Sequence, residues 1–339
     1  MKRPTIVDIA RRVGVSKAAV SYALNGRAGV SAATRERILD VAAQLGWDAA
    51  GPARTPADRT GAIGLVLART PQELRAAPLL GHWLAGVEAA LGEYGLALQV
   101  ALPPDAETEL DTYRRWAAER RVDGVIVTDL RAEDPRPSLL RELELPAVIL
   151  GEHERGGGAA VLRAAAEEEV RSVVEHLAEA GHRRIGHVQC GPDLEHTRRR
   201  NALLRGRVRE RLGTDLIKAE AEATESGAEL ATWRLLAADP PPTAIVYDND
   251  LMAVAAVARA AELGVRVPDD LAVLSWQDSM LCRVVTPPVT ALSQDVEDDA
   301  AAAVHLLLEL IETGAADDLD VPPRALIPRA STGGASRAS

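Results

Sequence analysis

Polar and basic side chains that could contact nucleic acid are concentrated near the N-terminus, in residues 17–24. Between the apolar positions of this segment, Lys17, Ser21 and Tyr22 are expected to point outward, where such side chains can approach phosphates and base edges without steric conflict. Lys17 could donate to O6 and N7 of guanine, whereas Ala18 offers only apolar contact, for instance to a thymine methyl group. This chemistry requires the segment to be an exposed helix.

Three short helical patterns would position that segment. The first begins after Thr5, whose hydroxyl can cap it, and ends at Gly14, which tolerates positive φ. Ser16 can cap the second helix and Ser31 a third. Two short helices joined by a tight turn containing glycine are typical of a helix-turn-helix, whose second helix enters the major groove. On spacing alone, a helical bundle without a nucleic-acid role stays open.

The charge distribution separates a head from a body. The chain of 339 residues has a net charge of −11, but residues 1–60 hold ten Lys/Arg and five Asp/Glu. This segment therefore carries +5 and the remainder −16. A short basic head on a long acidic body suits a head that meets phosphate and a body that does not. A solvated basic helix would have the same charge, so charge alone is weak evidence.

Residues typical of catalysis or metal binding form no recognised motif. His182, His187 and Cys190 lie close together in sequence, but their spacing gives no closed set of metal ligands. The sequence has no glycine-rich phosphate loop, no Gly-x-Ser-x-Gly elbow and no helical His-Glu-x-x-His, and Gly156–Gly158 is better interpreted as a turn. We therefore predict that the protein is not an enzyme and has no cofactor and no metal.

Cysteine content and hydropathy indicate the compartment. The sequence has only two cysteines, Cys190 and Cys282, which fits a reducing environment. The N-terminus lacks the apolar region of a signal peptide, and no apolar run reaches the roughly 18 residues of a membrane span. These observations predict a cytoplasmic protein without a membrane partner.

From residue 61 onward, apolar runs alternate with helical patterns. Runs such as Val122–Thr128 and Ala244–Tyr247 are continuously apolar, which indicates parallel sheets covered on both faces by helices. Because the order repeats after residue 160, we expect two similar doubly wound lobes with a ligand cleft at the carboxyl ends of their strands. The predicted fold class is an all-α head followed by a two-lobed α/β body.

The head closely resembles that of the lactose-repressor (LacI/GalR) family, over residues 5–26 and 30–38 and through Leu45-Gly46-Trp47. The matching segments of the body are 175–185, 248–250 with 252–253, 263–271, 287–288 and 329–332. The resemblance therefore covers nearly the whole chain. It implies a sequence-specific DNA-binding transcription regulator, a repressor whose operator binding is modulated by a small-molecule effector such as a sugar. It also implies a body with the fold of periplasmic sugar-binding proteins.

The resemblance implies which residues of the head and linker contact DNA. In the head these are Thr5, Ser16, Lys17, Ala18, Ser21, Tyr22, Asn25, Ser31 and Thr34. In the family the linker folds into a short hinge helix on DNA and places a leucine in the minor groove. Here Ala53 and Arg54 match that pattern, but Pro56 stands at the leucine position. Proline is apolar and can act as a wedge, yet it breaks a helical ladder, so a hinge helix and a flexible tether both stay open.

The resemblance also implies four effector-binding residues, Arg200, Asn249, Asp250 and Gln277. Arginine suits bidentate contact to hydroxyls or a carboxylate. Gln277 stands where an aspartate is expected, with Asp278 beside it, and an amide lacks the charge but retains an acceptor. The paired aspartates expected near 165–166 and the aromatic residue expected near 223 are alanines. These departures leave room for an altered effector or for a degenerate pocket.

The predicted domains are residues 1–47 (helix-turn-helix), 48–60 (linker), 61–160 with 291–322 (first lobe), 161–290 with 323–332 (second lobe) and 333–339 (tail). Two chains are expected to form a homodimer through their bodies and to place two recognition helices in successive major grooves of an inverted-repeat operator in double-stranded DNA. No leucine heptad follows Arg329, so a coiled-coil tetramer is not supported. A corepressor-dependent regulator stays open beside an inducible repressor.

Overall fold

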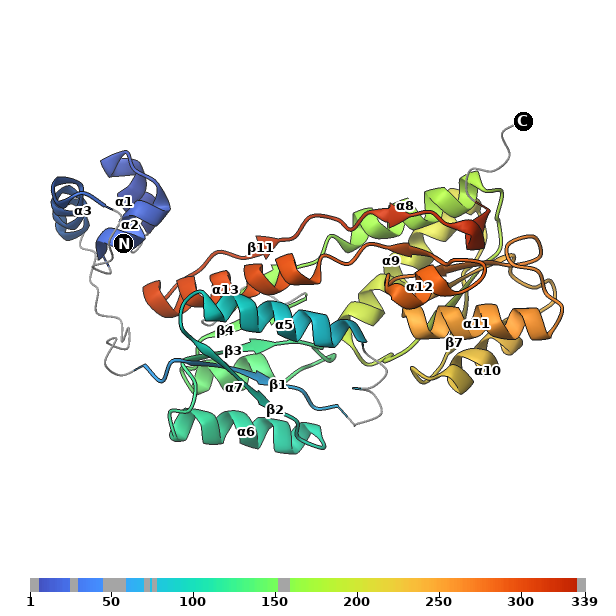
Figure 1. Cartoon of the computed structure of the whole chain (residues 1–339), viewed down its shortest axis with the longest axis horizontal. Helices are drawn as coiled ribbons and strands as arrows, with labels where there is room; N and C mark the ends of the chain where they lie inside the picture. Colours follow the sequence, from blue (N-terminus) through green and yellow to red (C-terminus); the bar gives the residue numbers. More distant parts are fainter. Residues whose placement is uncertain are drawn as a thin grey trace.

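The computed structural model of the chain describes residues 6–24, 30–44, 59–69, 74, 78–151 and 159–333. These residues form a head of three helices and a body of two α/β lobes (Figure 1). The fold class expected from the sequence is therefore confirmed.

The head is a three-helix unit of α1 (Ile6–Val13), α2 (Lys17–Leu24) and α3 (Ala32–Gln44). Each helix contributes apolar side chains to one small core, in which Ile9, Val20 and Ile38 are fully buried. None of these helices is long enough to be stable alone in water, so the shared core holds them in place.

The first lobe contains a six-stranded sheet in the order β11-β5-β4-β3-β1-β2, and all of its strand pairs are parallel. Its strands are β1 (Ala62–Val66), β2 (Ala97–Ala101), β3 (Gly124–Val127), β4 (Ala147–Leu150), β5 (Ala159–Arg163) and β11 (Leu319–Asp320). Its helices are α5 (Pro78–Gly92), α6 (Ala106–Ala118), α7 (Arg136–Glu142) and α13 (Val296–Thr313).

The second lobe contains a sheet in the order β12-β10-β9-β8-β6-β7, which is parallel except for the antiparallel pair of β12 with β10. Its strands are β6 (Ile185–Gln189), β7 (Ile217–Glu220), β8 (Ala244–Tyr247), β9 (Ala272–Ser275), β10 (Thr290–Leu292) and β12 (Leu326–Ile327). Its helices are α8 (Ala166–Glu179), α9 (Glu195–Leu212), α10 (Glu225–Leu236), α11 (Asp250–Glu262), α12 (Met280–Val284) and the 3-10 helix η2 (Ala330–Thr332).

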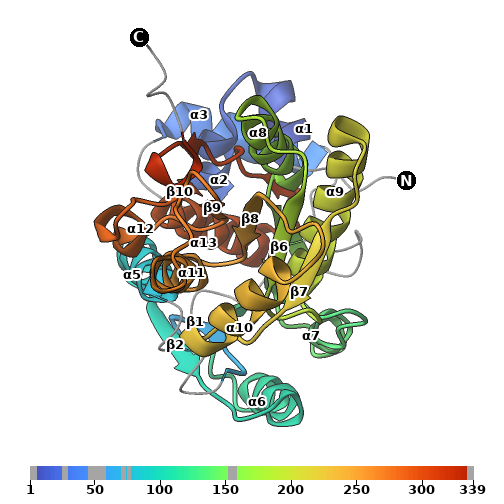
Figure 2. The same cartoon turned by 90° about the vertical axis from the view of Figure 1, so that its right-hand side faces the viewer.

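Both sheets are buried on both faces, because alternate side chains of each strand enter different cores. In the first lobe, Ile126 packs toward α5 and α13, whereas Val125 and Val127 pack toward α6 and α7. In the second lobe, Ile245 packs toward α10 and α11, and Val246 packs toward α8 and α9. Figure 2 shows these two helix pairs on opposite sides of the second sheet.

The chain crosses between the lobes at residues 164–165, 293–295 and 321–325. Two predicted boundaries are therefore displaced by a few residues. The boundary at 160 falls inside β5, which pairs with β4 in the first sheet, and the boundary at 291 falls inside β10, which pairs with β9 in the second. In both cases a strand completes its sheet before the chain crosses.

Candidate DNA-binding head and interlobe site

The turn between α1 and α2 fixes the start of the candidate recognition helix. Gly14 has φ +77°, a conformation that favours glycine, and the N–H groups of Gly14 and Val15 both donate to the carbonyl of Ala10. Ser16 then caps α2, since its Oγ accepts from the N–H of Ala19 at 3.2 Å. Arg37 of α3 donates to the carbonyl of Val13 at 3.2 Å and ties the third helix to this turn.

The structure places several predicted DNA contacts on the surface of the head. Ser16, Lys17 and Ser31 are exposed, and Thr34 is half-buried. The hydroxyls of Ser31 and Thr34 lie 2.8 Å apart and the N–H of Thr34 donates to Ser31, so this pair caps α3 as well. Ala18, Ser21 and Tyr22 belong to α2, but their side chains lie outside the description. The predicted residues outside the described ranges are Thr5, Asn25, Ala53, Arg54 and Pro56.

A cluster of polar groups from the second lobe surrounds Asp248, directly after β8. The Arg200 guanidinium of α9 and His187 Nε2 both lie 3.1 Å from Asp248 Oδ1, and the N–H of Cys190 donates to Oδ2 at 2.9 Å. Burial alone would raise the pKa of Asp248, but His187 and Arg200 outweigh burial and lower it. The carboxylate is therefore charged and engaged from three sides.

One aromatic side chain, Trp276, and one amide side chain, Asn249, complete the cluster around Asp248. The guanidinium carbon of Arg200 lies 5.3 Å from the ring centroid of Trp276, within the range of a cation–π contact. Asn249 Oδ1 accepts from the N–H of Met252 at 2.8 Å and caps α11, while its Nδ2 faces Cys190 Sγ at 3.9 Å. Asn249 thus has a structural task with its oxygen and leaves its amide group beside the cluster.

Asp250 is fully buried at the first position of α11. Its Oδ1 accepts from the N–H of Leu251 at 2.9 Å, and its Oδ2 has no hydrogen-bond partner among the described residues. A buried acceptor without a partner carries a desolvation cost.

The first lobe faces this cluster with Arg69 and Asp129, which form an ion pair. Asp129 follows β3, has φ +53°, and its carbonyl accepts from Arg136 at 2.8 Å. Burial would raise the pKa of Asp129, but Arg69 and His196 hold it below its usual value.

Backbone hydrogen bonds also join the two lobes beside the cluster. The N–H of Glu195 donates to the carbonyl of Leu130 at 2.7 Å, the N–H of Ala132 donates to the carbonyl of Asp193 at 3.1 Å, and Arg131 and Leu194 form an isolated antiparallel bridge. We call these two segments, 130–132 and 193–195, the interlobe bridge. It connects the loop after β3 with the loop that enters α9.

Comparisons with known proteins agree with this geometry. Residues 5–49 match the family described as bacterial regulatory proteins, lacI family, and residues 174–332 match the periplasmic binding protein-like domain. An HTH-type transcriptional regulator of the aml 5′ region in Streptomyces limosus is 35% identical over 323 residues, which are 91% of this chain and 88% of that protein. The regulator CelR of Thermobifida fusca is 30% identical over 330 residues, 91% of this chain and 92% of CelR.

The chain belongs to the LacI family of bacterial regulatory proteins. A LacI-family transcriptional regulator from Bifidobacterium animalis subsp. lactis superposes with a TM-score of 0.75 at 33% identity, over 82% of this chain and 100% of that one. The CelR–cellobiose complex superposes with a TM-score of 0.73 at 27% identity, over 97% of this chain and 100% of that one. The protein is therefore a helix-turn-helix transcription regulator with a periplasmic-binding-protein-like body.

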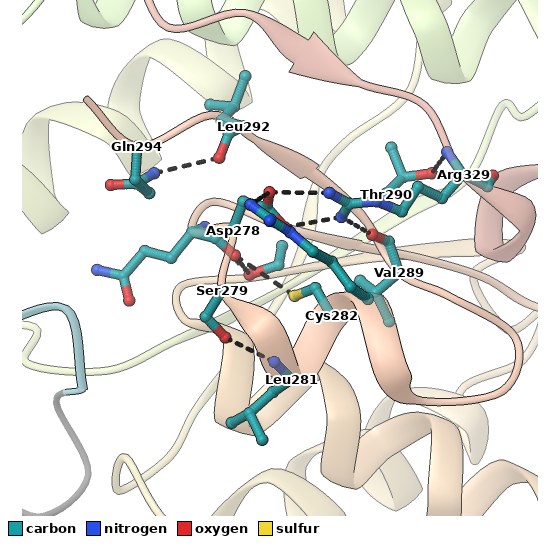
Figure 3. A network of polar contacts seen from close by, with 12 residues as sticks. Asp278, Ser279, Leu281, Cys282, Val289, Thr290, Leu292, Gln294 and Arg329 are labelled. Carbon is teal, nitrogen blue, oxygen red and sulfur yellow. Dashed lines mark hydrogen bonds and ion pairs between the residues drawn. The ribbon is translucent and has the colours of Figure 1, made fainter. Parts of the chain in front are cut away.

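Within the LacI-family body, Gln277 and its neighbour Asp278 have different surroundings. Gln277 follows β9, and its backbone is fixed by the Ser275 hydroxyl, which accepts from its N–H at 3.1 Å and donates to its carbonyl at 2.8 Å. Asp278 is buried and accepts two hydrogen bonds from Arg329, both at 2.8 Å (Figure 3). Because Arg329 engages both oxygens of Asp278, this carboxylate cannot replace the one that is expected at position 277.

Several residues of the interlobe cluster were not predicted from the sequence as ligand contacts. Asp129 and Arg69 come from the first lobe, and Trp276 comes directly after β9. The rule that side chains after parallel strands gather at one edge of the sheet would have found Asp129 and Trp276. Arg69 follows the end of the parallel strand β1, so the same rule applies to it.

The described residues provide neither a membrane-spanning helix nor a metal-binding cluster. None of their helices is long and apolar enough to cross a membrane. They contain no group of three or more His, Cys, Asp or Glu side chains arranged to hold a metal ion. The half-buried Cys190 thiol, whose pKa is raised by desolvation and by Asp248 to about 12, is protonated and a poor nucleophile.

Proposed function

We propose that the protein is a homodimeric, cytoplasmic repressor that binds an inverted-repeat operator through α2 of each chain. The observation that carries this proposal is the exposed start of α2, where Lys17 and its capping Ser16 face solvent on a helix fixed by the head core. A helix held in this way can enter a major groove without rearranging the head. Ala18, Ser21 and Tyr22 would contact bases or backbone from the same helix, and Thr5, Asn25, Ser31 and Thr34 would brace it.

A second copy of the chain is the proposed partner of α12. Met280 is 75% exposed and Val284 69% exposed on this short helix, which is unusual for large apolar side chains. A twofold interface buries the same patch of both chains and orients two heads toward two half-sites. The linker residues Ala53, Arg54 and Pro56 would lie between head and body and approach the minor groove.

We infer that the effector is a polyhydroxylated molecule, a sugar or a related metabolite, held between the lobes by Arg200, Asn249, Asp250 and Gln277. Arg200 and the Asn249 amide supply donors, and Asp250 Oδ2 supplies an acceptor without a partner among the described residues. Hydroxyl groups need both kinds of partner. CelR, whose structure holds cellobiose, supports the same class of effector. No cofactor and no catalytic step is part of this proposal.

DNA binding is tested by fluorescence anisotropy with the DNA upstream of the protein's own gene and with a scrambled duplex. We expect selective, salt-sensitive binding. Lys17→Ala is expected to weaken it about tenfold and to reduce the salt slope by about one. Lys218→Ala is the matched control, because this lysine lies in β7 of the second lobe. Equal binding to both duplexes, or equal loss in both variants, would overturn the proposal.

The effector is tested by thermal shift with a panel of sugars and nucleosides, followed by the DNA assay with each hit. A hit that weakens DNA binding identifies an inducible repressor, and one that strengthens it identifies a corepressor-dependent regulator. We expect Gln277→Ala to reduce the shift, since its side chain can exchange hydrogen bonds with hydroxyls. Intact DNA binding without any hit would favour a degenerate pocket.

A further inference from the structure

Helix α9 carries seven arginines, and five of them have acidic partners. These five are Arg199 with Glu167, Arg200 with Asp248, Arg207 with Glu175 and Glu210, Arg209 with Asp215, and Arg211 with Glu175. Arg198 and Arg205 have no ion-pair partner among the residues that the structure describes. They are separated by seven positions and so lie on one face of the helix.

That face of α9 lines a pocket of about 250 Å³. The residues lining it are Gln189, Pro192, Arg198, Asn201, Ala202, Arg205, Lys218 and Glu220. They come from α9 and from the ends of β6 and β7, which lie side by side at one edge of the second sheet (Figure 2). We call this site the α9–β7 pocket. It contains none of the four predicted effector residues.

The charges of the α9–β7 pocket favour an anion. Lys218 Nζ lies 3.2 Å from Glu220 Oε1, so the only carboxylate of the pocket is already engaged by its only lysine. Arg198 and Arg205 remain, and guanidinium groups match the geometry of phosphate and carboxylate oxygens. The pocket is therefore positive where these two side chains face it.

Hydrogen-bond acceptors inside the pocket add a second requirement. Gln189 is 4% exposed, its Nε2 donates to Glu220 at 3.2 Å, and its Oε1 has no partner among the described residues. Asn201 Oδ1 is also buried and also has no hydrogen-bond partner among the described residues. Two buried amide oxygens without partners suit the hydroxyl groups of a ligand.

We propose that the α9–β7 pocket is a second ligand site, for a small polyhydroxylated anion such as a sugar phosphate. Arg198 and Arg205 bind the anionic group, and Gln189 and Asn201 accept from its hydroxyls. Pro192 lines the pocket one residue before Asp193, whose carbonyl accepts from Ala132 in the interlobe bridge. A ligand in this pocket therefore touches the segment that joins the lobes.

Calorimetric titration of the full chain tests this site with glucose 6-phosphate, fructose 6-phosphate and ribose 5-phosphate, and with glucose and inorganic phosphate. We expect at least one sugar phosphate to bind at least tenfold more tightly than glucose or phosphate alone. Arg205→Gln is expected to weaken that binding about tenfold, because it removes a charge-assisted contact. Arg209→Gln is the matched control, since Arg209 lies on the same helix but pairs with Asp215 outside the pocket, and it leaves the affinity within twofold of the parent.

Four results would overturn the proposal. The first three are no binding of any sugar phosphate at about 10 mM, affinity for inorganic phosphate equal to that for the sugar phosphates, and equal effects of Arg205→Gln and Arg209→Gln. Gln277→Ala separates the two sites, because it changes the interlobe site and leaves the α9–β7 pocket intact. Sugar-phosphate binding that is lost in Gln277→Ala and kept in Arg205→Gln would also overturn it. Operator binding without ligand is measured in parallel, so a failure here is distinct from a failure of the regulator proposal.

Discussion

A buried ion network in the first lobe gives a sharp test of how the interlobe bridge is held. The side chains of Arg136 and Glu109 are 2% and 1% exposed and lie 2.8 Å apart, and Arg136 also contacts Asp134 at 2.6 Å and the carbonyl of Asp129 at 2.8 Å. Arg131 reaches Glu109 at 3.1 Å. The network therefore fixes the loop that carries one half of the interlobe bridge.

The perturbation is Arg136→Met, which keeps an unbranched apolar stem and removes the charge. Glu109 and Asp134 then remain buried with Arg131 as the nearest cation, so we expect a loss of about 3–5 kcal/mol in the free energy of unfolding. At about 2–4 °C per kcal/mol for a domain of this size, the Tm falls by roughly 10 °C. Arg121→Met is the control, because Arg121 and Glu119 form an exposed pair, and such pairs contribute about 0–1 kcal/mol.

The pH dependence of this loss has a definite sign. Burial would raise the pKa of Asp134, but Arg136 outweighs burial and lowers it below 3.8. A carboxyl group with a lowered folded-state pKa stabilises the fold above its unfolded pKa and loses this contribution as the pH falls through the folded value. The difference between parent and Arg136→Met is therefore largest near pH 7 and shrinks below about pH 4.

The assay is urea unfolding of the full chain at several pH values, with circular dichroism as the measure of the folded fraction. A loss in Arg136→Met no larger than that in Arg121→Met would refute the assignment of the network as a buried support. A loss that stays constant from pH 7 to pH 3 would refute its electrostatic origin.

Three further outcomes follow from the same structure. Gly14→Ala adds a Cβ that meets no neighbouring atom, but alanine disfavours the φ of +77° at this position. We expect thermal melting of this single variant to show about 1 kcal/mol of destabilisation in the head, with effector binding unchanged. Asn249→Ala removes the cap of α11 and the amide beside Cys190, so it is expected to cost about 1 kcal/mol of stability and to weaken the effector response in the DNA assay. Met280→Lys places a charge on the exposed apolar face of α12. We expect sedimentation to shift from dimer to monomer and operator binding to weaken. A dimer that stays intact in this variant would show that α12 is not part of the interface.

Local sequence signals were sufficient to predict the head and the strands that form the two cores. Gly14 and Ser16 mark the turn and the cap, and α2 occupies the predicted residues 17–24. Continuous apolar runs such as Ala244–Tyr247 identified central strands, because a strand covered on both faces needs apolar residues throughout.

Elements with weak local signals were missed. The strand β7 alternates half-buried and exposed residues because it lies at an edge of the sheet, and its sequence Ile-Lys-Ala-Glu has no apolar run. Helix α6 begins at Ala106, directly after the cap provided by Asp105. Its acidic first turn hid the amphipathic pattern, and the cap residue was the signal to follow.

The interlobe site shows a different limit of sequence reasoning. The position of Arg200 was predicted, but its pairing with Asp248 and its contact with Trp276 depend on how helix α9 meets the ends of β8 and β9. The role of Asp278 could not be seen either, because its partner Arg329 is 51 residues away in sequence. Long-range pairs of this kind are fixed by the tertiary fold and leave no periodic signal.

The strength of the interlobe bridge bears on how an effector could act. Its two backbone hydrogen bonds each contribute about 1 kcal/mol net, so the bridge is worth about 2 kcal/mol. An effector can transmit to the head no more than the difference in its affinity for two arrangements of the lobes, which is typically 1–3 kcal/mol. A bridge of this strength is within the range that ligand binding can form or break. The bridge is therefore one contact between the lobes whose strength matches the free energy that an effector bound between them could supply.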